Sequence, residues 1–314
     1  MTAPVAEQLQ LHPVSADAQG GSVFLAVERR WEPPGAALPN ALTCDVEDYF
    51  QVSAFEHLVP KANWRDWECR IPRNVDRALQ LYADAGVQGT FFTLGWVAEH
   101  HPDVVRRIAD AGHEVASHGM QHVRVWDQTP DAFRADIART KNLLEDVSGK
   151  PVRGYRAASW SLDTRTPWAH QIMAEEGYEY SSSVYPISHD HYGVPEAPVQ
   201  PFYIKGAGIL EIPASASRLW GRNLPAAGGG YFRLLPLAAS RWLMRRVRRV
   251  AGVPAVFYFH PWELDPDQPR MPGITLKTRF RHYLNLRRFE PRLVRLLRDL
   301  PWGRMDEIYL DHGA

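Results

Sequence analysis

Short apolar runs alternate with amphipathic segments over the first half of the chain. Residues 41–44 (ALTC) are apolar and stop abruptly at a group of carboxylates, which predicts a buried strand. Apolar residues then recur at helical spacing over 73–85, and Gly86 follows as a helix stop. The β-branched and aromatic residues of 89–94 (GTFFTL) predict a second strand.

The alternation continues beyond residue 94, although the second half of the chain is less regular. Thr129-Pro130 and Thr166-Pro167 each place a capping hydroxyl before a proline that fits the first helical position. The pattern predicts helices at 102–112, 129–149, from 166, at about 237–250 and at about 281–298. It predicts strands at 113–117, 152–157, 255–259 and 306–310.

Strands that alternate with helices of ten or more residues predict an α/β fold with a parallel sheet. The number of repeats favours a closed or nearly closed barrel, in which reactive residues lie at the carboxyl ends of the strands. Residues 1–38 are rich in Ala, Pro, Gly and Gln. We therefore expect a poorly ordered N-terminal extension over 1–38 and one domain over 39–314.

Composition narrows the class of protein. The chain is 45% hydrophobic and 23% charged with a formal net charge of zero, so nucleic acid is not expected as a partner. No apolar run reaches the roughly 18–20 residues of a membrane span, and residues 1–40 lack the pattern of a secretory signal. We therefore expect a cytoplasmic protein. Residues 241–300 hold 14 Lys and Arg against 5 Asp and Glu, which suits either a solvated helix face or weak peripheral contact with the anionic inner membrane.

Two groups of candidate ligands directly follow predicted strands. Asp45, Glu47 and Asp48 place three carboxylates within four residues, where their repulsion calls for a cation or a shared proton. His118 and His122 are four residues apart and can reach one metal ion if the segment turns. Taken singly, the first group also fits a solvated turn and the second a pair of surface histidines.

Two further strands end at polar residues, Arg156 and His260. Singly, the arginine could only neutralise the carboxylates and the histidine could only pack. All four groups, however, terminate strands of one predicted barrel. Together they supply metal ligands, a base, an orienting cation and an acid, which are the components of metal-assisted amide hydrolysis.

These residues stand in motifs that resemble those of the carbohydrate esterase family 4 polysaccharide deacetylases, which include the rhizobial nodulation-factor deacetylase. TCDVED (43–48) resembles the family's Thr-Phe-Asp-Asp-Gly motif, and HGMQH (118–122) resembles His-Ser/Thr-x-x-His. Arg156 matches a third motif, and FYFH (257–260) resembles Leu-x-Leu-His. The family's fourth motif has no clear match.

Four longer stretches resemble one subgroup, the exosortase-associated deacetylases encoded with exopolysaccharide gene clusters in bacteria whose proteins carry a PEP-CTERM sorting signal. The stretches are DVEDYFQVSAFE (45–56), ASHGMQH (116–122), NLPAAGGGYFRLLP (223–236) and FYFHPWELDP (257–266). The resemblance covers roughly 40–310 and includes a subgroup-specific C-terminal extension from about residue 200.

The resemblance implies a distorted (β/α)₇ barrel with a divalent metal, often zinc, held by one carboxylate and two histidines. His118 and His122 match the two histidines. An extended backbone would make Glu47 the carboxylate, whereas a turn would make it Asp48, and the sequence leaves both open. By the same resemblance, Asp45 is the base, Arg156 the cation beside it, and His260 the acid that protonates the leaving amine.

The implied activity is metal-dependent removal of the N-acetyl group of an amino sugar. The substrate would be an N-acetylated polysaccharide or a lipid-linked oligosaccharide precursor in exopolysaccharide biosynthesis. Two alternatives stay open. The first is hydrolysis of a small non-sugar amide, such as a ureide, which a deep closed pocket would favour, whereas an open groove would favour a polymer. A catalytically silent carbohydrate-binding protein would follow from the altered first and third motifs.

Overall fold

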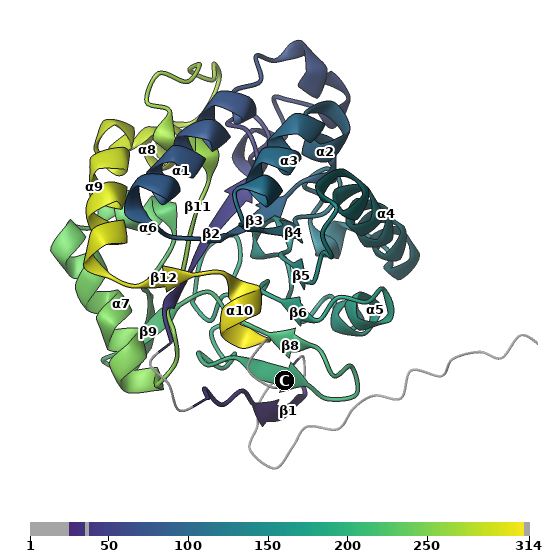
Figure 1. Ribbon diagram of the computed structural model, residues 1–314, viewed down its shortest axis with the longest axis vertical. Helices are drawn as coiled ribbons and strands as arrows, with labels where there is room; N and C mark the ends of the chain where they lie inside the picture. The colour runs from purple at the N-terminus through teal and green to yellow at the C-terminus, as the bar shows by residue number, and fades with distance from the viewer. Residues whose placement is uncertain (1–24, 35–37, 311–314) are drawn as a thin grey trace, which may run out of the picture.

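The computed structural model describes residues 25–34 and 38–310, and seven parallel strands form its centre (Figure 1). Each strand pairs in parallel with the next. In spatial order they are β11 (Val256–Phe259), β2 (Asn40–Val46), β3 (Thr90–Thr93), β4 (Glu114–Ser117), β5 (Gly154–Tyr155), β6 (Tyr180–Ser181) and β8 (Leu210–Glu211). Within the described residues no pairing joins β8 to β11, so the barrel stays open there. The expected distorted (β/α)₇ barrel is confirmed.

Helices surround this sheet. In Figure 1, α9, α1, α3 and α4 follow one another from left to right, and α7 lies below α9. The longer helices are α1 (Ile71–Ala85), α3 (Pro102–Asp110), α4 (Pro130–Ser148), α7 (Leu237–Ala251), α8 (Leu276–Tyr283) and α9 (Leu286–Asp299). Shorter ones are α2 (Gly95–His100), α5 (Ala169–Glu175), α6 (Gly229–Leu234) and α10 (Met305–Tyr309). Within the described ranges, none of them is both long enough and apolar enough to cross a membrane.

Local signals set several of these boundaries as predicted. Gly86 and Gly149 end α1 and α4 in the left-handed conformation, with φ of 63° and 65°. Thr129 caps α4 by accepting a hydrogen bond from the backbone N–H of Ala132. All seven residues of β2 are buried, as its apolar run predicts.

Three predictions about elements were wrong. Residues 305–309 form helix α10, not a strand, because Met305, Ile308 and Tyr309 bury one helical face. The last long helix is divided into α8 and α9 at Asn285, whose φ is 53°. The segment after Thr166 turns first, with the Thr166 hydroxyl bonded to the backbone of Asp163, and α5 begins only at Ala169.

The N-terminal segment is also more ordered than expected. β1 (Val27–Arg30) pairs antiparallel with β7 (Phe202–Ile204), which in turn pairs antiparallel with β8. Trp31 is buried and contacts Tyr309 edge-on. The expectation of a poorly ordered extension over 1–38 is therefore wrong for 25–34, while 1–24 and 35–37 lie outside the described residues.

Two smaller features complete the architecture. β12 (Trp302–Gly303) pairs with the start of β2. A separate hairpin, β9 (Ala216–Leu219) with β10 (Arg222–Pro225), stands outside the main sheet. Since the seven central strands are parallel, their carboxyl ends lie at one end of the barrel, where the candidate residues follow them.

Candidate active site

Three buried side chains form a potential metal centre at the carboxyl ends of β2 and β4. Glu47, His118 and His122 each offer one ligand atom, and these atoms lie within 4.8 Å of one another. Glu47 and His118 directly follow their strands, and His122 reaches them from the next turn with a φ of 53°. Two imidazoles and one carboxylate are a donor set typical of zinc.

His118 is oriented for metal binding by the backbone of the neighbouring strand. Its Nδ1 lies 2.8 Å from the carbonyl oxygen of Arg156 and donates to it, which leaves Nε2 free. Burial lowers the pKa of His118 to about 4. The ring is therefore neutral near pH 7, the form that binds a metal.

Glu47 faces both His122 and His260. Its Oε2 lies 2.9 Å from His122 Nε2, and its Oε1 lies 3.5 Å from His260 Nε2. The approach to His122 does not have hydrogen-bond geometry, so this buried oxygen has no hydrogen-bond partner. Burial alone would raise the pKa of Glu47, but His122 and the other histidines outweigh it and lower the pKa to about 2. An ionised, unsatisfied oxygen beside imidazole nitrogens fits a cation.

The geometry distinguishes Glu47 from Asp48. Asp48 lies outside the three-residue cluster, and its carboxylate accepts hydrogen bonds from the backbone N–H groups of Tyr49, Arg70 and Ile71, at 2.8, 2.5 and 3.2 Å. Burial raises the pKa of Asp48 to about 6 against these bonds. Asp48 therefore anchors the start of α1, and the alternative in which it binds the metal does not agree with the structure.

Asp45 and Arg156 form a buried ion pair beside the metal centre. Arg156 NH1 donates to Asp45 Oδ1 at 2.6 Å and to the Thr43 hydroxyl at 2.8 Å. Its other nitrogens donate to the carbonyl and hydroxyl of Ser182, and the guanidinium lies 4.0 Å over the ring of Phe92. Since Arg156 has no exposed surface, these contacts fix the Asp45 carboxylate in one position.

His260 lies next to the cluster, beside Glu47. Its ring stacks on Trp262 at 5.2 Å, and its Nδ1 lies 3.3 Å from Glu263 Oε2. Burial alone would lower the pKa of His260, but the contact with Glu263 and the charge of Glu47 raise it to about 9. His260 is therefore protonated near neutral pH.

Sequence reasoning missed the two residues that hold His260. Glu263 Oε2 also accepts the backbone N–H of His260 at 3.0 Å, and Arg233 Nε donates to Glu263 Oε1 at 2.7 Å. A Cβ on Gly229 would collide with the Glu263 carboxylate, so only glycine fits at this position of the run 228–230. The available signal was the run of three glycines followed closely by an arginine.

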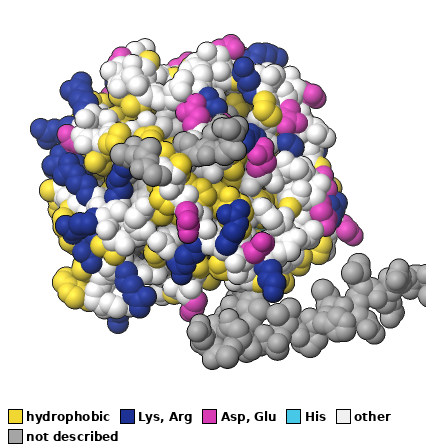
Figure 2. Space-filling model, turned by 60° about the horizontal axis from the view of Figure 1, so that its bottom comes forward, with side chains coloured by type: hydrophobic (Ala, Val, Ile, Leu, Met, Phe, Trp, Pro, Cys, Tyr) yellow, Lys and Arg dark blue, Asp and Glu magenta, His cyan; other side chains and the backbone are white. Residues whose placement is uncertain are grey.

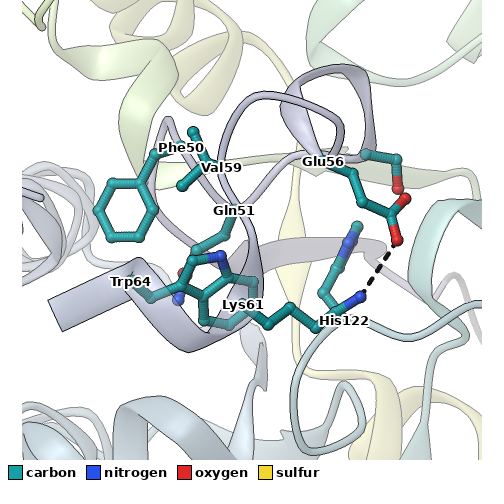
Figure 3. A pocket seen from close by; sticks show the side chains of 8 residues that line it. Phe50, Gln51, Glu56, Val59, Lys61, Trp64 and His122 are labelled. Atoms are coloured by element: carbon teal, nitrogen blue, oxygen red, sulfur yellow. Dashed lines mark hydrogen bonds and ion pairs between the residues drawn. The ribbon is translucent and has the colours of Figure 1, made fainter. Parts of the chain in front are cut away.

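A small hollow opens to solvent beside His122 (Figure 3). It is lined by Phe50, Gln51, Ser53, Glu56, Val59, Lys61, Trp64 and His122. In Figure 3 the Lys61 side chain runs past the His122 ring to Glu56, and the two charged groups lie 3.2 Å apart. The metal centre is thus next to a surface opening.

Two family models match adjoining segments of the chain. The family model "Polysaccharide deacetylase" matches residues 65–181, and a "Domain of unknown function" model matches 182–310. The first segment, which holds both histidines and Arg156, therefore resembles polysaccharide deacetylases. The second segment holds Arg233, His260 and Glu263.

Two curated relatives share part of the chain. A peptidoglycan deacetylase of Helicobacter pylori is 27% identical over 110 residues, or 35% of this chain and 36% of that protein. A chitooligosaccharide deacetylase of Rhizobium leguminosarum bv. trifolii is 33% identical over 96 residues, or 29% of this chain and 44% of that protein. The match thus spans less than half the length of either relative.

A solved structure shares the fold over nearly its whole length. A Mycobacterium smegmatis protein provisionally assigned as a polysaccharide deacetylase superposes with a TM-score of 0.55 at 23% identity. The superposition covers 89% of this chain and 93% of that one. It supports the α/β barrel over both matched segments.

Proposed function

We propose that this protein removes the N-acetyl group of an amino sugar in a glycan, using a divalent cation, which we take to be zinc, at Glu47, His118 and His122. The observation that carries the proposal is the convergence of these three buried ligands with the Asp45–Arg156 pair and His260. The names of the two relatives, a peptidoglycan deacetylase and a chitooligosaccharide deacetylase, support an N-acetylated glycan as the substrate class.

Two residues next to the cluster carry out the two proton transfers. A divalent cation there would polarise the acetyl carbonyl and make water more acidic. Asp45, held by Arg156, accepts the proton of the attacking water. His260 carries a proton that it donates to the departing sugar amine, and Glu263 keeps its ring in place. The products are acetate and a glycan with a free amine.

The biological setting is part of the same proposal. The four stretches at 45–56, 116–122, 223–236 and 257–266 support the exosortase-associated subgroup and a role in exopolysaccharide biosynthesis. The substrate would then be the polymer or its lipid-linked precursor, modified in the cytoplasm. The hollow beside His122 opens to solvent, which supports a polymer over a small amide. The complete ligand set supports an active enzyme over a silent binding protein.

The test is acetate release from N-acetylglucosamine oligomers and from the host's exopolysaccharide. Purified protein is treated with a chelator and assayed with and without added zinc. We expect zinc-dependent release that is lost in the His118→Ala/His122→Ala variant and kept in His57→Ala, which changes an exposed histidine outside the cluster. Stoichiometric metal binding without release from either glycan would contradict the substrate class, and absence of metal binding would contradict the proposal as a whole.

A further inference from the structure

Cations are concentrated along one stretch of the chain and on one side of the molecule. Residues 212–262 contain eight arginines and no aspartate or glutamate. This stretch forms the β9–β10 hairpin, α6, α7 and β11. Figure 2 shows many Lys and Arg side chains on the side of the molecule where α7 and α9 lie in Figure 1.

Helix α7 presents a cationic face with an exposed tryptophan. Its buried residues are Ser240, Leu243, Met244 and Val247. The remaining side chains at helical spacing, Trp242, Arg245, Arg246 and Arg249, lie at i, i+3, i+4 and i+7 and therefore share the outward face. Trp242 is 45% exposed, in contrast to the buried tryptophans at the active site.

The β9–β10 hairpin extends this face. Trp220 lies in its turn and is 90% exposed, and Arg218 and Arg222 on either side of it are exposed as well. Arg246 joins the two elements, because its guanidinium donates to the carbonyl of Arg218 at 3.1 Å and lies 5.7 Å from the ring of Trp242. We call this surface the arginine–tryptophan face: Arg218, Trp220, Arg222, Trp242, Arg245, Arg246 and Arg249.

Among the residues that the structure describes, the cations of this face have no acidic partner. Across 25–34 and 38–310, no carboxylate forms an ion pair with any of its five arginines, whereas neighbouring Arg241 is paired with Asp299. Arginines without counter-charges attract anionic groups, and an indole ring left in water gains from a boundary that is apolar on one side and wet on the other.

We propose that the arginine–tryptophan face binds the surface of a membrane that contains anionic lipids. The arginines would contact lipid phosphates, and Trp220 would lie among the headgroups, where tryptophan is enriched. A second copy of this chain is a poorer occupant because it would oppose arginines with arginines. An acidic glycan is also less well matched, since Trp220 projects from a turn with nine-tenths of its surface exposed and does not line a cleft.

The test is cosedimentation of the full chain with phosphatidylcholine vesicles, with and without phosphatidylglycerol, at low and high salt. We expect binding that requires the anionic lipid and weakens with salt. Since each arginine near such a surface contributes about fivefold in affinity, Arg245→Gln/Arg246→Gln/Arg249→Gln should weaken binding on the order of 100-fold. Trp220→Ser should weaken it further.

A matched control removes the same charge on the side of α3 and α4, with Arg106→Gln/Arg139→Gln/Lys150→Gln. We expect this control to bind vesicles nearly as the wild type does. Equal loss in both triple variants would show that only net charge matters and would overturn the proposal. Binding to a soluble acidic polysaccharide but not to the vesicles would overturn it in favour of a glycan surface.

Acetate release from soluble oligomers separates this proposal from the catalytic one. The arginine–tryptophan face lies on α7 and the β9–β10 hairpin. None of its residues belongs to the metal centre, and neither Asp45 nor His260 is part of it. Its variants should therefore keep wild-type release if they fold. A protein that binds vesicles but releases no acetate would leave this proposal standing and contradict only the catalytic one.

Discussion

Replacing Arg233 by methionine should strongly destabilise the protein, although this residue touches neither the metal ligands nor solvent. Arg233 is 3% exposed, and Glu263, its partner at 2.7 Å, has no exposed surface. Methionine keeps much of the apolar volume and removes the charge. The variant would leave Glu263 Oε1 without the guanidinium and leave its negative charge uncompensated on that side.

The magnitude follows from what the guanidinium holds. Loss of one partner of a buried ion pair costs about 3–5 kcal/mol. Arg233 also donates to the carbonyl oxygens of Arg281, His282 and Leu284, so its loss releases the junction between α8 and α9 as well. We therefore expect the free energy of unfolding to fall by at least about 3 kcal/mol.

The loss should grow with pH. In the wild type, burial raises the pKa of Glu263, but Arg233 and His260 outweigh it and lower the pKa below its usual value. Glu263 therefore stabilises the wild type above about pH 4.5, and this contribution is lost as the pH falls. Without Arg233 the folded-state pKa of Glu263 rises, which weakens or reverses that contribution. The deficit should thus be larger at pH 8 than at pH 5.

Urea unfolding of both proteins at pH 5 and pH 8 measures these differences. Arg77→Met is the control, because it breaks the exposed pair with Glu290 and should cost less than about 1 kcal/mol. Glu263→Gln in the Arg233→Met background should restore part of the stability by removing the buried charge. A cost for Arg233→Met no larger than that of the control, or one that shrinks with rising pH, would refute the reasoning.

Three further predictions concern other parts of the barrel. Glu47→Gln should weaken zinc binding by more than about 100-fold, whereas Asp48→Asn should change zinc affinity by less than about tenfold. Calorimetric titration measures both affinities, and the reverse order would make Asp48 the ligand. Gly229→Ala should lower the free energy of unfolding by about 1–3 kcal/mol, because the new Cβ clashes with the buried Glu263 carboxylate. Gly230→Ala has open space around it and should not lower it. Equal effects in urea unfolding would argue against the clash. Burial raises the pKa of Glu114 to about 8, so stability should fall between about pH 4.5 and pH 8, and Glu114→Gln should flatten that slope in urea titrations.

The sequence predicted the first half of the barrel because its helix ends and buried strands are marked by residues close together in the chain. Gly86 and Gly149 end their helices where the sequence places a stop, since both positions require a positive φ. The apolar run at 41–44 predicts a buried strand, and all residues of β2 are indeed buried. The carboxylates that follow this strand therefore lie at the carboxyl end of the barrel. In contrast, the five residues of α10 are too few for periodicity to separate a helix from a strand.

The parts of the site that the sequence left open depend on contacts between distant segments. Asp48 is excluded from the metal centre by backbone N–H groups of Arg70 and Ile71, more than twenty residues away. Glu263 acquires its role from Arg233, thirty residues earlier, and from the close approach of Gly229. No short-range pattern encodes such pairings, whereas the strand ends that carry His118 and His260 are encoded locally.

The central claim is that the cluster of Glu47, His118 and His122 holds the ion on which deacetylation depends. The most direct measurement is the initial rate of acetate release from N-acetylglucosamine oligomers as zinc is added to chelator-treated protein, with bound metal counted in the same samples. The account predicts that the rate rises with occupancy and saturates at one zinc per chain. Full activity of the metal-free protein would contradict it.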